Sequence, residues 1–221
     1  MSIDRRKSLG LIGAASIAGF LSGNSPADDS TKANGAPHKW AQVEPRELIR
    51  ERYFPNVTLT THEGKSVRLY DDLVKDKIVV MNFMYTSCGN VCPLVTENLV
   101  KVQRQLAPRM GRDIFFCSFT LDPAHDAPSV LKDYSKLHRA AGPGWTFLTG
   151  TPSTMEMLRR RLGFTDPDPE KDKDKENHIG NIRYGNEPRL LWGACPGMSH
   201  VEVIVEAISW VEWPKKSDTA G

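Results

Sequence analysis

Two cysteines at the point where a buried strand gives way to a helix constrain this chain more than any other feature. Residues 78–85 are a short run of apolar, β-branched and aromatic side chains, which predicts a buried strand. From Leu94 onwards the apolar residues recur with helical spacing, and Pro93 suits the first turn of that helix. Cys88 and Cys92 are therefore expected at a strand-to-helix junction.

This position favours redox or metal chemistry at the two cysteines. The unpaired N–H groups and partial positive charge of a helix N-terminus stabilise a thiolate, which is the form that attacks disulfides and binds soft metals. The alternative is a structural disulfide. A bridge between Cys88 and Cys92 would close a very small loop and would restrain little of the unfolded chain. We therefore interpret the pair as reactive or metal-binding.

The first 27 residues predict an export signal. Arg5, Arg6 and Lys7 precede a mildly apolar stretch that is short for a membrane span, and small residues around Ala27 suit cleavage. The paired arginines resemble a twin-arginine signal, and the alternative is an uncleaved N-terminal anchor. We expect an exported, periplasmic protein that meets the membrane only through this segment, if it is not cleaved.

Charge and composition divide the remaining chain. Loss of residues 1–27 would lower the formal net charge from +2 to about zero, so no basic surface for nucleic acid is indicated. Residues from about Asp28 to Trp40 are polar and small, and we assign residues 28–50 to a flexible leader. We assign residues 51–214 to one domain and residues 215–221 to a tail.

Strands that alternate with helices predict an α/β layered domain. Residues 57–70 predict a β-hairpin, and residues 113–122 and 145–148 predict further strands with helices between them. Residues 166–177 carry many charges and almost no apolar side chain, which predicts a mobile charged loop inserted at the surface.

Four other residues are of types that could act with the cysteine pair. Cys117 lies in the middle of an apolar strand, and we expect it to be a core residue without a metal role. Cys195 is left open between a buried thiol, an auxiliary ligand and a partner for another cysteine. His178 follows the charged loop and is either a solvated histidine or a ligand. Asp122 ends a strand, where it either accepts a hydrogen bond near the cysteines or caps its loop.

Taken together, these features resemble the Sco (SenC) family of copper chaperones, exported thioredoxin-fold proteins that help to assemble the binuclear copper centre of cytochrome oxidase. The resemblance extends from about residue 57 to residue 211. It is carried by the segments at 85–93, 119–128 and 145–150, and by a histidine after a variable loop.

The resemblance implies a thioredoxin-like fold with an N-terminal β-hairpin extension and a charged loop insertion. It also implies that Cys88, Cys92 and His178 bind one copper ion, since thiolates select Cu(I) and imidazole accepts Cu(I) or Cu(II). Copper would pass to the apoprotein of a respiratory copper enzyme, such as the cytochrome oxidase copper-centre subunit, so the protein would be a metallochaperone rather than a catalyst. Gly89 and Asn90 stand where family members commonly have Pro-Asp.

The main alternative is a thiol–disulfide oxidoreductase that keeps target cysteines reduced for metallation. Cys88 would attack as the thiolate and Cys92 would resolve the mixed disulfide. A peroxidase-like relative is a third possibility, but it would need a cation beside Cys88, and the neighbouring sequence has none.

Overall fold

Seven strands form one mixed sheet in the order β2-β1-β5-β4-β3-β6-β7. The computed structural model describes residues 44–175 and 180–212. The strands are β1 (Thr58–Thr61), β2 (Ser66–Arg68), β3 (Ile78–Met84), β4 (Ile114–Thr120), β5 (Trp145–Thr149), β6 (Asn181–Asn186) and β7 (Leu191–Pro196). Strands β3, β4 and β5 run parallel, whereas the remaining pairs are antiparallel.

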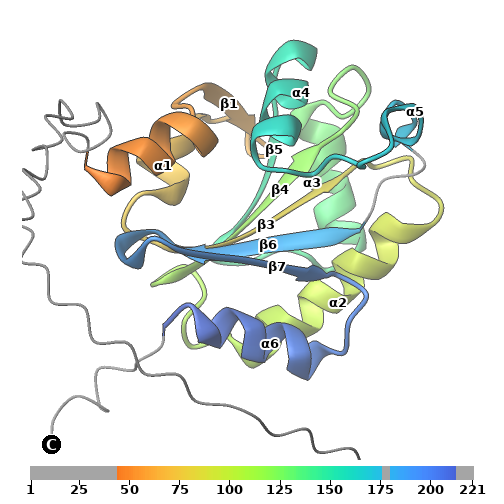
Figure 1. The fold of residues 1–221 in the computed structure, drawn as a ribbon. Helices are drawn as coiled ribbons and strands as arrows, with labels where there is room; N and C mark the ends of the chain where they lie inside the picture. The colour runs from red at the N-terminus through yellow and green to blue at the C-terminus, as the bar shows by residue number, and fades with distance from the viewer. Residues whose placement is uncertain (1–43, 176–179, 213–221) are drawn as a thin grey trace, which may run out of the picture. The chain divides into compact units, whose positions relative to one another are not determined.

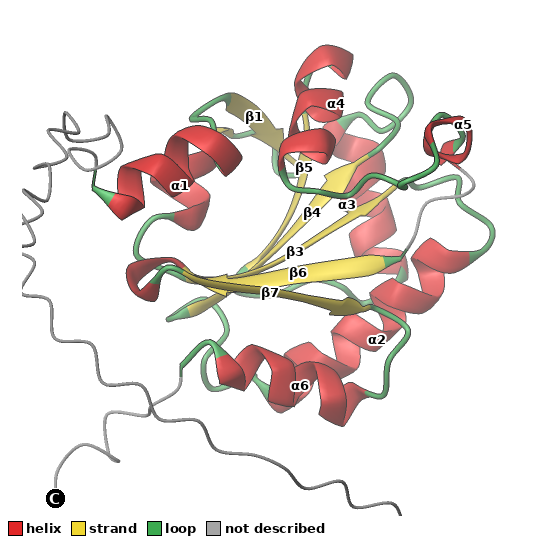
Figure 2. Cartoon of the chain, in the orientation of Figure 1, coloured by secondary structure: helices red, strands yellow, loops and turns green. Residues whose placement is uncertain are grey.

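Helices cover both faces of this sheet (Figures 1 and 2). They are α1 (Pro45–Tyr53), α2 (Val91–Gln105), α3 (Pro128–Leu137), α4 (Pro152–Arg161), α5 (Pro169–Asp172) and α6 (Val201–Trp210), with two short helical segments, η2 (Leu69–Val74) and η4 (Glu187–Arg189). Apolar residues of α2, α3 and α6 pack in one core cluster, and those of α1, α4 and η2 pack in a second cluster on the opposite face. The predicted α/β layered domain is confirmed.

Strand β3 is buried along its whole length because it lies inside the sheet with helices on both sides. Its side chains alternate between the two faces, as the pleat requires. Val80 and Met84 join the cluster beneath α2, whereas Met81 and Phe83 join the cluster beneath α4. This double burial explains why the strand reads as an unbroken apolar run in the sequence.

The structure tests two sequence predictions at the beginning of the domain, the hairpin and the leader. The predicted hairpin is confirmed, since β1 and β2 pair antiparallel and β1 joins the sheet next to β5. The predicted leader, residues 28–50, differs from the structure over its last six residues, because α1 begins at Pro45. In the described ranges 44–175 and 180–212, no helix combines the length and apolar character that crossing a membrane requires.

A buried carboxylate fastens α1 to the rest of the domain. Arg46 of α1 donates two hydrogen bonds of 2.6 Å to the Glu187 carboxylate, whose side chain is only 2% exposed. The Tyr70 hydroxyl and the backbone N–H of Asp76 donate to the same carboxylate at 2.7 and 2.9 Å. These bonds join residues up to 141 positions apart, so α1 belongs to the folded domain.

We predict that Glu187→Gln weakens the fold and flattens its response to acid. Burial raises the pKa of Glu187, but hydrogen bonds from Arg46, Asp76 and Tyr70 outweigh burial and lower this pKa below its ordinary value. The ionised carboxylate therefore stabilises the fold at neutral pH, and this stabilisation is lost as pH falls through the folded-state pKa. Urea unfolding at neutral pH should show a loss of about 1.5–3 kcal/mol, the range for hydrogen bonds to charged groups.

The same urea unfolding experiments, repeated at decreasing pH, test the role of Glu187. In Glu187→Gln, the free energy of unfolding should fall less steeply below about pH 5 than in the unaltered chain. Glu51→Gln alters an exposed carboxylate on α1, the helix that Glu187 fastens, and is the matched control. It should change neither the free energy of unfolding at neutral pH nor its decrease in acid. If the free energy of unfolding falls as steeply in acid in Glu187→Gln as in the unaltered chain, the ionised Glu187 carboxylate does not stabilise the fold.

Candidate metal centre

The loop between β3 and α2 brings Cys88 to the N-terminus of α2. The backbone N–H of Cys92, in the first turn of the helix, donates to Cys88 Sγ over an N···S distance of 3.5 Å. The N-cap residue Asn90 makes no side-chain capping hydrogen bond. The sulfur of Cys88 therefore accepts from an N–H group that the start of a helix leaves unpaired. The predicted position of both cysteines at a strand-to-helix junction is confirmed.

The two thiols lie in different environments. Cys88 is half-buried, whereas Cys92 is 2% exposed and packs in the core beneath α2. Burial alone would raise the pKa of Cys88, but hydrogen bonds from the Cys92 thiol and from nearby backbone N–H groups outweigh burial and lower this pKa below its ordinary value. Burial, followed by the hydrogen bond with Cys88, raises the pKa of Cys92 to about 12. Cys88 is therefore the thiol that ionises first.

A buried carboxylate that the sequence analysis did not single out holds the loop before Cys88. Asp126 is 1% exposed and accepts hydrogen bonds from the backbone N–H of Thr86, from the Thr86 hydroxyl and from the Thr120 hydroxyl. Thr120 ends β4, the strand next to β3. Because Thr86 is two residues before Cys88, these bonds fix the backbone from which the thiol projects. The only sequence signal was an acidic residue in a proline-bounded loop.

Asp122 takes the loop-capping role that the sequence left open. Its backbone carbonyl accepts from the N–H groups of His125 and Asp126, at 3.1 and 2.9 Å. Its carboxylate lies 2.9 Å from His125 Nδ1 and accepts from Lys175 Nζ at 2.6 Å. Among the residues that the structure describes, no hydrogen bond joins Asp122 to a cysteine.

His178 lies outside the described residues, but the chain on each side of residues 176–179 can be located. On one side, Lys175 Nζ lies 5.0 Å from the centre of the Tyr85 ring, three residues before Cys88. On the other side, Gly180 is so close to the start of α2 that an added Cβ would lie 2.8 Å from Val95 and 3.1 Å from Val91. Lys175 therefore lies near the loop that leads to Cys88, and Gly180 lies against the first turns of the helix that carries Cys92.

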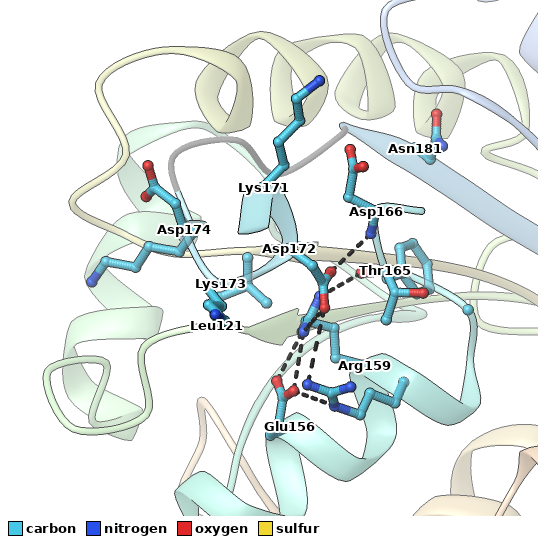
Figure 3. A pocket seen from close by; sticks show the side chains of 14 residues that line it. Leu121, Glu156, Arg159, Thr165, Asp166, Lys171, Asp172, Lys173, Asp174 and Asn181 are labelled. Atoms are coloured by element: carbon cyan, nitrogen blue, oxygen red, sulfur yellow. Dashed lines mark hydrogen bonds and ion pairs between the residues drawn. The ribbon is translucent and has the colours of Figure 1, made fainter. Parts of the chain in front are cut away.

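The charged insertion is fastened to α4 before it reaches this site (Figure 3). Arg159 of α4 bridges Glu156 and Asp172, with N···O distances between 2.5 and 3.0 Å. The hydrogen bond from Arg159 is the main cause that lowers the pKa of Asp172 to about 2. These residues line a polar hollow of about 610 Å³. The described part of the predicted charged insertion contains helix α5, and its mobility stays a prediction.

The other two cysteines lie in different environments, since Cys195 packs against the same core cluster as the pair and Cys117 belongs to the cluster on the opposite face. Cys117 is buried on the sheet face beneath α4, which confirms it as a core residue. Cys195 is half-buried on β7, where burial raises the pKa of its thiol to about 11. Within residues 44–175 and 180–212, no three His, Cys, Asp or Glu side chains are grouped so as to hold a metal ion. The described part of the chain thus offers a two-sulfur site.

Comparison with known proteins agrees with this architecture. The SCO1/SenC family model matches residues 47–209 of the chain. The SCO1 protein homolog of Bacillus subtilis (strain 168) is 30% identical over 93 residues, which are 42% of this chain and 47% of that protein. The aligned region thus spans about half the length of this curated relative.

Solved structures share the fold over most of their length. A SCO1/SenC family lipoprotein from Bacillus anthracis str. Ames superposes with a TM-score of 0.59 at 26% identity, over 70% of this chain and 92% of that one. BsSco, a member of the Sco family of cytochrome c oxidase assembly proteins, gives 0.58 at 23% identity, over 72% and 92%. Yeast Sco1 with copper bound gives 0.56 at 19% identity, over 73% and 93%. The predicted thioredoxin-like fold class is confirmed.

We predict that Cys88 is the first thiol to be alkylated in the reduced, metal-free protein. Iodoacetamide reacts with thiolates, so the lowered pKa and half-exposed position of Cys88 should make it react fastest at neutral pH. Cys92, Cys117 and Cys195 should follow at least tenfold more slowly, because burial raises the pKa of each. Peptide mapping by mass spectrometry after timed quenching measures all four rates. Labelling of Cys92 as fast as Cys88 would contradict the proposed difference between the two thiols.

Proposed function

We propose, from the premise that this chain belongs to the SCO1/SenC family, that it binds one copper ion through Cys88, Cys92 and His178 and delivers it to the apoprotein of a respiratory copper enzyme such as cytochrome c oxidase. Yeast Sco1 has been solved with copper bound, and BsSco belongs to a family of cytochrome c oxidase assembly proteins. In this proposal copper is the substrate that the protein transports, and the two cysteines bind it during transport.

The observation that carries the proposal is the position of the two sulfurs at the start of α2. Cys88 Sγ accepts the Cys92 N–H, and the pKa of Cys88 is lowered, so this thiol ionises more readily than an ordinary cysteine. Copper binding at Cys92 would displace its proton, because a metal ion stabilises the thiolate far more than a hydrogen bond does. Thiolate sulfur is the ligand type that selects Cu(I).

The third ligand is proposed from chain length. His178 is two residues before Gly180, which contacts the first turns of α2. Two extended residues span at most about 7 Å, so the backbone of a ligand two positions before Gly180 would lie no farther than this distance from Gly180, beside the start of α2. The described residues supply no third donor to this site. An imidazole would complete a two-sulfur, one-nitrogen set that accepts both Cu(I) and Cu(II).

Delivery requires that the ion can leave as well as bind. Cys88 is half-exposed at the surface end of the site, where thiols of a copper-enzyme apoprotein could reach the ion. Ligand exchange would then replace the three donors stepwise, without net oxidation or reduction. In this scheme residues 1–27 export the protein to the periplasm, and an uncleaved segment would hold it at the membrane.

The second candidate function is thiol–disulfide exchange, and the difference between the two thiols favours it. A half-exposed Cys88 beside a buried Cys92 matches the division between an attacking and a resolving cysteine. In that scheme the Cys88 thiolate attacks a target disulfide, and Cys92 then displaces the reduced target as the Cys88–Cys92 disulfide forms. The protein would keep target cysteines reduced for metallation. His178 would be dispensable to this reaction.

We predict that His178→Ala separates the two functions. The variant should keep its fold and its oxidisable thiol pair but lose at least tenfold in Cu(II) affinity, because nitrogen is a preferred Cu(II) donor. The loss for Cu(I) should be smaller, since two thiolates can hold Cu(I) alone. Competition with chelators measures both affinities, and the thiolate-to-Cu(II) absorption band reports the ligand set. His200→Ala, which alters an exposed histidine at the start of α6, is the control. Unchanged affinity and an unchanged band in His178→Ala would make the oxidoreductase the better account.

A further inference from the structure

A second cavity lies on the sheet face opposite to the cysteines. Its volume is about 510 Å³, within the range of about 300–1,000 Å³ that small-molecule pockets occupy. Residues of α1, of β3 and from the end of α4 line it, and the strands β6 and β7 close one side. Phe54, Met81 and Leu162 belong to the core cluster beneath α1 and α4, whereas Cys92 belongs to the other cluster. The cavity is therefore separate from the proposed copper site.

Two buried N–H donors in the walls of this cavity have no acceptor. They are Arg183 Nε and Trp192 Nε1, neither of which makes a hydrogen bond within the described part of the chain. In the β6–β7 register, Arg183 lies opposite Ala194 and Gly185 lies opposite Trp192. The two donors therefore project from the same face of adjacent strands as diagonal neighbours. A buried donor without a partner loses its hydrogen bonds to water and gains none in return, which indicates that an acceptor is missing.

Arg183 also lacks a counter-charge. Its guanidinium donates to the Gly163 carbonyl and lies 5.3 Å from the centre of the Phe164 ring, but no described carboxylate contacts it. Two other partly buried arginines, Arg109 and Arg159, each bind carboxylates. Burial lowers the pKa of Arg183, whereas carboxylates raise the pKa of those two.

The charged side chains that line the cavity are all positive. Arg161 joins Arg183 in the lining, and none of the described residues that line the cavity is acidic. Arg161 donates to the backbone carbonyl of Glu51, so its charge is not neutralised there. An apolar cavity with two arginines and no carboxylate is complementary to a ligand with an apolar body and one negative group.

We propose that this cavity binds a small amphipathic carboxylate, whose apolar body lies against Phe54, Met81 and Leu162 and whose carboxylate accepts hydrogen bonds from Arg183 Nε and Trp192 Nε1. A carboxylate has two oxygens, so it can satisfy both donors at once, and it supplies the charge that Arg183 lacks. A neutral alcohol of the same length could fill the apolar space but would leave the guanidinium uncompensated. Charge, rather than apolar contact, should therefore decide affinity.

The test uses octanoate and 1-octanol as matched probes on the purified full chain. The indole N–H signal of Trp192 is identified in a ¹H–¹⁵N spectrum by its loss in Trp192→Phe. Octanoate should shift this signal downfield and saturably, and 1-octanol should bind at least tenfold more weakly. Arg183→Met should lower octanoate affinity at least tenfold and leave 1-octanol affinity unchanged. Arg112→Met, an exposed arginine that does not line the cavity, should behave as the unaltered chain.

Three results would overturn the proposal: equal affinity for the two probes, octanoate binding in folded Arg183→Met as tight as in the unaltered chain, or the absence of a saturable shift of the Trp192 signal. Should Arg183→Met fail to fold, Trp192→Phe provides the second variant, because it keeps an aromatic ring at the position that packs on Phe54 and removes the N–H donor together with one ring of the indole. Calorimetry should then show a several-fold loss of octanoate affinity in Trp192→Phe. Unchanged affinity in that variant would equally exclude the carboxylate site.

Discussion

The hydrogen bond from the Cys92 N–H to Cys88 Sγ is the interaction on which this structure depends for its chemistry. It exists because β3 is buried on both faces and because α2 packs against the same sheet, so both ends of the connecting loop are fixed. The helix start leaves backbone N–H groups without partners, and a sulfur, instead of a side-chain cap, accepts one of them. Burial opposes ionisation of that thiol, but hydrogen bonds from the Cys92 thiol and from backbone N–H groups outweigh burial.

Supports beyond the pair hold this arrangement together. Asp126 fixes Thr86, Lys175 lies beside the Tyr85 ring, and Gly180 lies against the first turns of α2. On the other side of the sheet, the Arg46–Glu187 ion pair fastens α1, which forms one wall of the second cavity. The two faces of one sheet thus carry separate sites, with soft sulfur donors on one and buried cationic and indole donors on the other.

The sequence predicted what local periodicity determines, and missed what distant partners determine. The apolar run of β3, the helical spacing of α2 and the two cysteines between them could be recognised because each signal lies within a few neighbouring residues. Asp126 could not be distinguished from Asp122, because its three donors come from strand ends that only the fold brings together. Helix α1 was assigned to the leader because its stabilising partner, Glu187, lies 141 positions away. The role of His178 stays a prediction.

The central claim is a site of two sulfurs and one nitrogen, and copper K-edge X-ray absorption tests it most directly. The measurement would use the reduced chain loaded with one equivalent of Cu(I), with His178→Ala as the reference. The account predicts a first coordination shell of two sulfur scatterers and one nitrogen scatterer, with the outer-shell pattern of an imidazole that disappears in the variant. A sulfur-only shell, or a nitrogen contribution that persists in His178→Ala, would contradict it.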